Sequence, residues 1–157
     1  MDELRETTLE HLDAIAANAR KADVFECYFL NGKPFCETLR DALRVSRSTT
    51  TWMHNGKPAA VYGVSLIKEE KASPWLLGSK LMDSFLEPGS IRNQSRFMKK
   101  SRWIVGGWQE MYSSLENHVW KENKRAVEWL RALGFEIHPA EPFGKSREPF
   151  HKFTWSK

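Results

Sequence analysis

The sequence has few cysteines and no long hydrophobic run. Cys27 and Cys36 are its two cysteines, and neither belongs to a CxxC pair or to a Cys/His spacing typical of zinc ligands. We therefore expect a reducing compartment and no metal site. No stretch approaches the roughly 20 apolar residues of a membrane span, and the first 15 residues carry five acidic side chains, unlike a signal peptide. These features predict a protein that stays in the cytoplasm and has no membrane partner.

A long basic stripe with interleaved aromatic residues is also lacking, so we do not expect nucleic acid as a partner. The formal net charge is nevertheless +4 and the sequence pI about 9.1. Much of the excess lies between Arg92 and Arg102. This concentration of cations indicates an anionic ligand, although a mild positive charge also serves solubility alone.

What the sequence does contain is ordinary globular composition, with 41% hydrophobic and 28% charged residues. Its 157 residues predict one domain over 1–157 with a single core. Seven tryptophans is a high number for this length, and it fits core packing, a planar-ligand site or a protein interface. We expect Trp52 and Trp155 to be partly exposed, as anchors for a contact with another chain.

The first third of the chain reads as a short strand at 4–8 and an amphipathic helix from about residue 10 to 22. A linking run at 23–32 and a second helix at 34–45, with Pro34 at its start, follow. Next come a strand rich in Thr and Trp at 48–54 and an apolar strand at 59–67, joined by the hairpin signal Asn55-Gly56. A third strand begins at Pro74.

Helical spacing of apolar residues predicts one long helix at 94–113. The pair Gly106-Gly107 in its middle costs roughly 1 kcal/mol per glycine relative to alanine. We therefore expect a neighbouring backbone or a ligand close to it, or a bend in the helix. The elements expected after this helix are a strand at 115–120, a helix at 123–132 and strands at 135–138 and 150–155. Gly134 is the expected left-handed stop of the last helix.

This order of elements resembles that of the GNAT N-acetyltransferase fold. The sharper likeness is local: the run from Val119 to Ala126, and its continuation from Trp129 to Phe135, is similar to the closing strand, helix and Gly-Phe of that family. Over nearly its whole length the chain is similar to small GNAT-like proteins of short-tailed bacteriophages. The motifs that carry this likeness are Asn55-Gly56-Lys57-Pro58, Trp75-Leu76-Leu77-Gly78, Leu115-x-Asn117-x-Val119-Trp120 and Phe150-x-x-Phe153-Thr154.

The resemblance implies an α/β fold with a mixed, mostly antiparallel sheet flanked by helices. It implies transfer of acetyl from acetyl-CoA to an amine, with the acceptor unspecified. Some bacteriophage proteins of this kind are internal virion proteins, so the alternative is a non-catalytic virion part, internal or at the head-tail junction. A host-directed protein that inhibits by contact is a third reading. The expected location is the host cytoplasm or the packaged virion, and the expected partners are other virion proteins or further copies of the chain.

The cofactor loop departs from the family pattern. The segment 88–101 has no glycine-rich run, and the resemblance implies that the cations Arg96, Lys99 and Lys100 take its place at the acetyl-CoA phosphates. A charge run at a helix start is also commonly a solvated face. Asn123, at the start of the last helix, is expected to cap that helix, and in the family this residue also reaches the cofactor.

The catalytic residues are less clearly marked. The family's tyrosine in the last helix protonates the departing thiolate, and the matching position here is Leu130, which has no proton to give. Glu26 matches a region near the acceptor site in the family, or is a lone surface carboxylate. Asn117 either lines the cofactor site or is satisfied by neighbouring backbone. His118, on the opposite face of the same strand, is either a base near neutral pH or partly buried packing.

Overall fold

The computed structural model describes residues 2–157 and forms one eight-stranded sheet in the order β1-β2-β3-β4-β5-β8-β6, with β7 also paired to β8. All neighbouring strands are antiparallel except β4 and β5, so the expected mixed, mostly antiparallel sheet is confirmed. The strands are β1 (Asp2–Glu6), β2 (Ser46–His54), β3 (Lys57–Lys68), β4 (Lys71–Gly78), β5 (Ser114–Trp120), β6 (Glu136–Ile137), β7 (Glu141–Phe143) and β8 (Glu148–Ser156).

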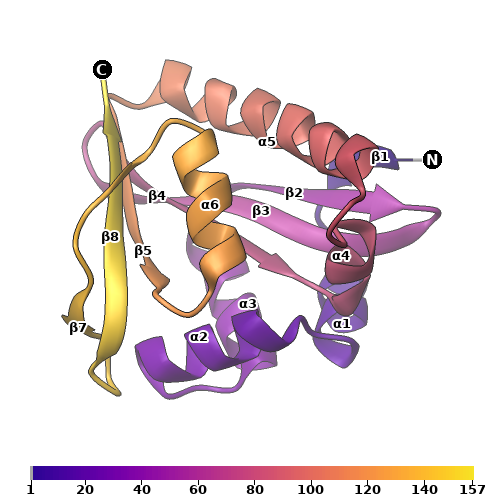
Figure 1. Ribbon diagram of the computed structural model, residues 1–157, viewed down its shortest axis with the longest axis horizontal. Helices are drawn as coiled ribbons and strands as arrows, with labels where there is room; N and C mark the ends of the chain where they lie inside the picture. Colours follow the sequence, from indigo (N-terminus) through magenta and orange to yellow (C-terminus); the bar gives the residue numbers. More distant parts are fainter. Residues whose placement is uncertain (1) are drawn as a thin grey trace.

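Helices cover both faces of this sheet (Figure 1). The helices are α1 (Leu9–Ala17), α2 (Lys21–Asn31), α3 (Phe35–Val45), α4 (Lys80–Phe85), α5 (Ile91–Met111) and α6 (Lys124–Ala132). The larger apolar cluster lies between the sheet and α5 and α6, with Phe97 and Trp108 among its buried members. A smaller cluster lies under α1, α2 and α3 and includes Leu12, Cys27 and Leu39. The sheet therefore divides the apolar core into a larger part under α5 and α6 and a smaller part under α1, α2 and α3.

Two local predictions made from turn chemistry are confirmed. Asn55 and Gly56 have φ values of 50° and 76°, which is the pair of positive angles that a type I′ hairpin requires. Gly134 follows α6 with a φ of 96°, in the region that favours glycine. Both positions are fixed by the backbone itself, which explains why the sequence reveals them.

The linking run expected at 23–32 is wrong, because most of it belongs to helix α2, which ends at Gly32 in left-handed geometry. The helix escapes detection because Phe25 and Tyr28 are 41% and 55% exposed, so its apolar residues do not form one stripe. The short helix α4 was not expected either. It places a turn of helix directly after β4.

One of the three explanations expected for Gly106-Gly107, a neighbouring backbone, is wrong, because no atom of residues 2–157 outside the local backbone lies within 4 Å of a Cβ built on either glycine. A close ligand or a bend in the helix stays a prediction. The expected partial exposure of Trp52 is also wrong. Trp52 is fully buried, because Leu4 of β1 is its strand partner and the Phe85 ring packs on the Trp52 ring, with ring centres 4.9 Å apart. Trp155 is partly exposed, as expected. None of the helices described is long and apolar enough to span a bilayer.

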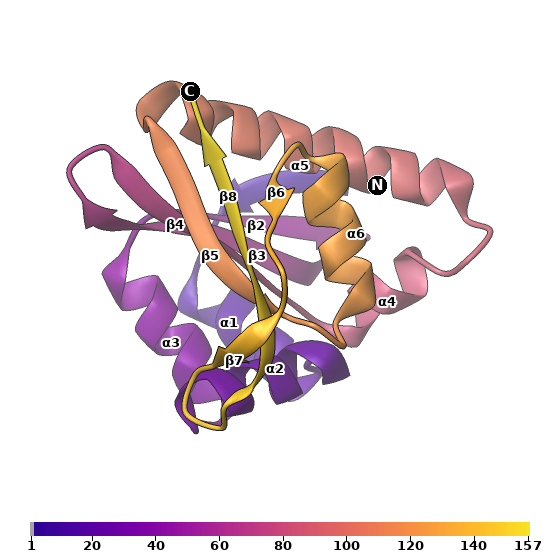
Figure 2. The same ribbon diagram turned by 60° about the vertical axis from the view of Figure 1, so that its left-hand side comes forward.

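The parallel strands β4 and β5 stay together for a short distance and then part (Figure 1). Their register includes just two pairs, Lys71 with Ser114 and Ala72 with Leu115. On its other side β5 pairs with β8 along its whole length, and β8 in turn carries β6 and β7 on its outer edge (Figure 2). The sheet is therefore opened between β4 and β5 and held together on either side.

The glycine at the end of α6 gives a stability prediction. Gly134→Ala should lower the free energy of unfolding by about 1 kcal/mol or more, because alanine is strained at a φ of 96° while its methyl group meets nothing within 4 Å. Gly106→Ala, in an open position inside α5, should raise it by roughly 1 kcal/mol. Urea unfolding of both variants measures the two effects. Equal stability of Gly134→Ala and the parent protein would contradict this assignment.

Candidate active site: a cavity where two parallel strands part

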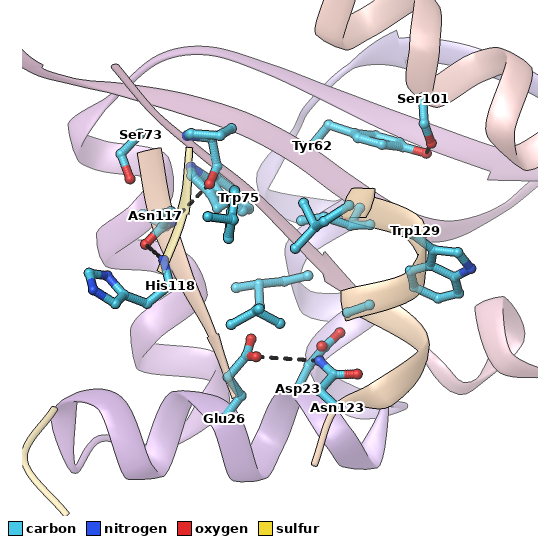
Figure 3. A pocket seen from close by; sticks show the side chains of 18 of the residues that line it. Asp23, Glu26, Tyr62, Ser73, Trp75, Ser101, Asn117, His118, Asn123 and Trp129 are labelled. Carbon is cyan, nitrogen blue, oxygen red and sulfur yellow. Dashed lines mark hydrogen bonds between the residues drawn. The ribbon is translucent and has the colours of Figure 1, made fainter. Parts of the chain in front are cut away.

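A cavity of about 280 Å³ occupies the space between the diverging ends of β4 and β5. Its apolar wall comes mainly from β4, α5, α6 and β8, and includes Leu76, Phe97, Val105, Trp129, Leu130 and Phe153. Polar residues of α2, β3, α5 and β5, and Asn123 just before α6, line the same space (Figure 3): Glu26, Tyr62, Ser101, Asn117, His118 and Asn123. An apolar space with a few convergent polar groups is typical of a small-molecule site.

The cavity begins at Asn117, whose amide bridges the two strands. Asn117 Nδ2 donates to the Pro74 carbonyl of β4 at 2.8 Å, and Asn117 Oδ1 accepts from the His118 N–H at 2.8 Å. Alternate residues of an antiparallel strand direct their backbone groups to the same edge. The Pro74 carbonyl points into the gap, so the N–H and C=O of Leu76, two residues further along β4, also point toward β5. They lie beyond the last residue pair that joins the two strands. The cavity wall thus offers one backbone donor and one acceptor.

Two carboxylates of α2 cap the strand ends on the far side of the cavity. Asp23 Oδ2 accepts from the Gly78 N–H at the end of β4, at 2.8 Å. Glu26 Oε1 accepts from the Trp120 N–H at the end of β5, at 2.7 Å. Residues three apart on a helix lie on one face, so a single turn of α2 satisfies both strands.

Arg20, the N-cap residue of α2, ties this corner together. Its guanidinium donates to Asp23 at 3.0 Å, to Asp83 of α4 at 2.7 Å and to Asn123 Oδ1 at 3.2 Å. It also lies 5.4 Å from the centre of the Trp129 ring. The side chains of Arg20 and Asp23 are each 5% exposed, so this is a buried ion pair with its hydrogen bonds satisfied.

Burial gives both carboxyls of α2 unusual acidities. Loss of water contact, with the nearby charge of Asp23, raises the pKa of Glu26 to about 7. Burial also raises the pKa of Asp23 to about 6, against the opposing pull of the Arg20 charge. Near neutral pH the Glu26 carboxyl therefore exchanges protons readily, which suits a general acid or base.

Tyr62 and Ser101 form a second polar pair inside the apolar wall. Their hydroxyl oxygens lie 2.9 Å apart, and both residues are buried. Burial raises the pKa of Tyr62 above its ordinary value, so the phenol stays protonated at neutral pH. Leu130, at the position that matches the family's tyrosine, lines the same cavity.

His118 lies on the other face of β5 from Asn117. Its ring is stacked on Phe143, with ring centres 3.6 Å apart and planes 8° apart. Burial and the charge of Lys152 lower the pKa of His118, so the imidazole is neutral at pH 7. Figure 3 shows the ring directed away from Glu26.

The structure thus brings together four of the residues singled out in the sequence: Glu26, Asn117, His118 and Asn123 all line the cavity. Asn123 does occupy the N-cap position of α6, but the expected side-chain cap is wrong. Its amide instead accepts from Arg20 and donates to Glu26 Oε1 at 3.4 Å. Asn117 combines both readings, since it lines the cavity and is satisfied by backbone.

The three predicted cations of α5 do not line the cavity. Arg96 and Lys99 are exposed on the outer side of the helix. Lys100 lies 3.4 Å from Asp2 and 6.0 Å from the Trp52 ring, toward β1. The amphipathic pattern of α5 explains this placement, because Phe97 and Ser101 occupy the inward positions. A phosphate contact by these cations stays a prediction.

Sequence reasoning missed Arg20, Asp23, Tyr62 and Ser101. Asp23 and Glu26 would have been recognised as a pair on one helical face if residues 23–32 had been assigned to a helix. Tyr62 sits in an apolar strand and carries no local signal of its own. Among residues 2–157, no group of three or more His, Cys, Asp or Glu side chains lies close enough to hold a metal ion.

Comparison with solved structures shows that the fold is that of GNAT N-acetyltransferases. A ribosomal-protein-alanine N-acetyltransferase from Brucella melitensis matches with a TM-score of 0.68 and 12% identity over 99% of each chain. An aminoglycoside N(6')acetyltransferase from Legionella pneumophila matches at 0.67 and 14%, over 99% of this chain and 91% of that one. The Escherichia coli ribosomal-protein-S18-alanine N-acetyltransferase matches at 0.63 and 14%, over 99% and 94%. No protein-family model and no curated protein matches the sequence.

The raised pKa of Glu26 gives a pH-dependent stability. A carboxyl whose pKa rises from 4.5 to about 7 on folding stabilises the protein fully below 4.5, and this contribution is lost as the pH rises through 7. Between pH 4.5 and 8 the parent protein should therefore lose on the order of 3 kcal/mol relative to Glu26→Gln. Urea unfolding of both proteins across this range measures the difference. Parallel stability curves would show that Glu26 titrates normally.

Proposed function

We propose that the chain transfers an acetyl group from acetyl-CoA to an amine, with Glu26 as the general base. The observation that carries this proposal is the place of the Glu26 carboxyl, which lines the cavity between the parted strands and accepts from the Trp120 N–H at 2.7 Å. Burial there raises the pKa of Glu26 to about 7. An attacking amine must lose a proton at neutral pH, and a base with a matching pKa is the group that this step needs. The fold that the chain shares with N-acetyltransferases supports the same chemistry here, and the residues of the cavity must supply it.

The cavity fits the acyl-pantetheine arm of acetyl-CoA. Its wall is largely apolar, and the Leu76 peptide offers a donor and an acceptor to an extended amide chain. The phosphates must lie outside, because Arg20 is the one Lys or Arg among residues 2–157 that lines the cavity, and it is already paired with Asp23 and Asp83. Arg96 and Lys99 stay candidates for a phosphate contact. When bound, acetyl-CoA supplies an acetyl group activated as a thioester.

Glu26 is held ready to take a proton. Its Oε1 accepts from the Trp120 N–H and from Asn123 Nδ2, which fixes the carboxyl, while no interaction described for residues 2–157 uses Oε2. We assign to Oε2 the proton that the amine loses as its nitrogen bonds to the acetyl carbon. The departing sulfur takes a proton in exchange, and the phenol of Tyr62, hydrogen-bonded to Ser101, is the donor on the cavity wall. His118 is less suited to these steps because its ring stacks on Phe143.

A contact role without catalysis, such as that of a virion component, is the second candidate. The observation that favours it is the outer side of α5, where Ile91, Trp103 and Met111 are 78%, 73% and 66% exposed. Exposed apolar groups of this size suit a contact with another chain. Mass spectrometry of purified bacteriophage particles tests this candidate. A fixed copy number in the particle would support it, and absence from the particle would remove it.

Calorimetry and kinetics with acetyl-CoA test the enzymatic proposal. The parent protein should bind one acetyl-CoA and acetylate an amine, with a pH profile of kcat/KM that rises near pH 7. Glu26→Gln should keep the binding but lose about 10² to 10⁴ in kcat/KM, because the base is gone while the cavity is unchanged.

The matched control is Glu110→Gln, which removes an exposed carboxylate of α5 that does not line the cavity and should leave kcat/KM unchanged. No heat of binding with millimolar acetyl-CoA would sink the proposal. Full activity of Glu26→Gln would remove Glu26 from its role.

A further inference from the structure

The hairpin of β7 and β8 is fastened to α2 at its tip. The Lys145 N–H donates to the Leu30 carbonyl at 3.0 Å, and the Ser146 N–H donates to the Phe29 carbonyl at 3.0 Å. Figure 2 shows this hairpin reaching down from the sheet to α2. These bonds satisfy carbonyls in the last turn of the helix, which have no partner within it. They also close the gap between α2 and the strand β8.

The fastening is tight because Gly144 lies directly against α2. A Cβ built on Gly144 would lie 2.9 Å from Leu30 Cα and 3.0 Å from both the Leu30 and Phe29 oxygens. All three are backbone atoms, which cannot turn aside as a flexible side chain does. Gly144 also has a φ of 77°, so its conformation favours glycine as well. The hairpin tip is therefore held by close backbone contact on top of two hydrogen bonds.

A second cavity of about 280 Å³ lies beside this hairpin. Pro142 and Phe143 of β7 line it together with Phe150 and Lys152 of β8. His118 lines both this cavity and the one that holds Glu26. The two spaces thus share His118 as a lining residue, and each has about the volume of a small-molecule site.

The rim of the second cavity offers charges of both signs. Glu141 contributes an exposed carboxylate. Lys152 contributes an ammonium. Its ion-pair partner Glu116 also pairs with Lys71, so the two lysines and the one carboxylate carry a net charge of one positive.

Resting on the proposed transfer reaction, we propose that the acceptor is a small-molecule amine that binds in the second cavity and reaches Glu26 past His118. A polypeptide is excluded, because its chain would have to lie between α2 and β8, where the hairpin is fastened. The acyl-pantetheine arm takes the side of the first cavity that faces α5 and α6 in this proposal, so the acceptor must approach from the side of α2 and the hairpin.

The test compares acceptors of different size. Spermidine, free lysine and glycinamide are each offered with acetyl-CoA, beside a ten-residue peptide with a free N-terminus. At least one small amine should exceed the peptide by 100-fold or more in kcat/KM. Independently of activity, the His118 imidazole signals in an NMR titration should shift with that amine and stay in place with the peptide.

Gly144→Ala tests the hairpin itself. Its methyl group should push the tip off α2, speed hydrogen exchange at the Lys145 and Ser146 amides, and reduce the preference for small amines at least tenfold. Gly56→Ala is the matched control, because Gly56 has a similar φ of 76° in another hairpin tip but no atom within 4 Å of the added group. It should leave the preference unchanged.

The outcomes separate the two proposals. Efficient acetylation of the peptide by the parent protein would overturn the size limit and leave the transferase intact. Shifts at His118 without any acetyl transfer would remove the transferase and uphold the small-amine cavity. If none of the small amines moves the His118 signals, or if Gly144→Ala behaves like Gly56→Ala, the inference is wrong.

Discussion

The parting of β4 and β5 is the constraint on which the site depends. Two parallel strands that separate after two residue pairs leave backbone N–H and C=O groups without strand partners, and such groups are costly when buried. The chain satisfies four of them with side chains and leaves the Leu76 peptide facing the cavity. Asn117 pairs with the Pro74 C=O and the His118 N–H, Asp23 with the Gly78 N–H, and Glu26 with the Trp120 N–H. Solving a hydrogen-bonding problem in the sheet thereby places two carboxyls at the end of an apolar cavity.

Placing carboxyls there has an energetic cost that the structure offsets unevenly. Asp23 is neutralised by the buried guanidinium of Arg20, which also joins α2 to α4 and to Asn123 at the start of α6. Glu26 has hydrogen-bond donors but no cation of its own, and burial raises its pKa to about 7. The asymmetry separates the roles of the two groups: Asp23 holds the corner together, and Glu26 is free to exchange a proton. Burial destabilises the ionised form of Glu26, which raises its pKa and makes the carboxyl suitable as a base.

The sequence predicts those parts of the fold that local chemistry dictates. Asn55-Gly56 and Gly134 require positive φ values, and the element order from β2 to α6, apart from α4, follows from apolar periodicity. The corner around α2 was not predictable in this way, because a helix with exposed Phe25 and Tyr28 lacks an apolar stripe. Without that helix the relation between Asp23 and Glu26 stays hidden. The hydrogen bond between the Trp120 N–H and Glu26 joins residues 94 positions apart, and apolar periodicity carries no information about such a contact.

The central claim is that folding holds the Glu26 carboxyl in the gap between the strands, poised to exchange a proton near neutral pH. The most direct measurement is a pH titration of its side-chain carboxyl carbon by NMR, assigned by comparison with Glu26→Gln. We expect the Glu26 carboxyl to titrate with a midpoint near pH 7, well above the ordinary glutamate pKa of 4.5. A midpoint near 4.5 would contradict it, because the carboxyl would then be solvated and ionised at every pH at which the enzyme is proposed to act.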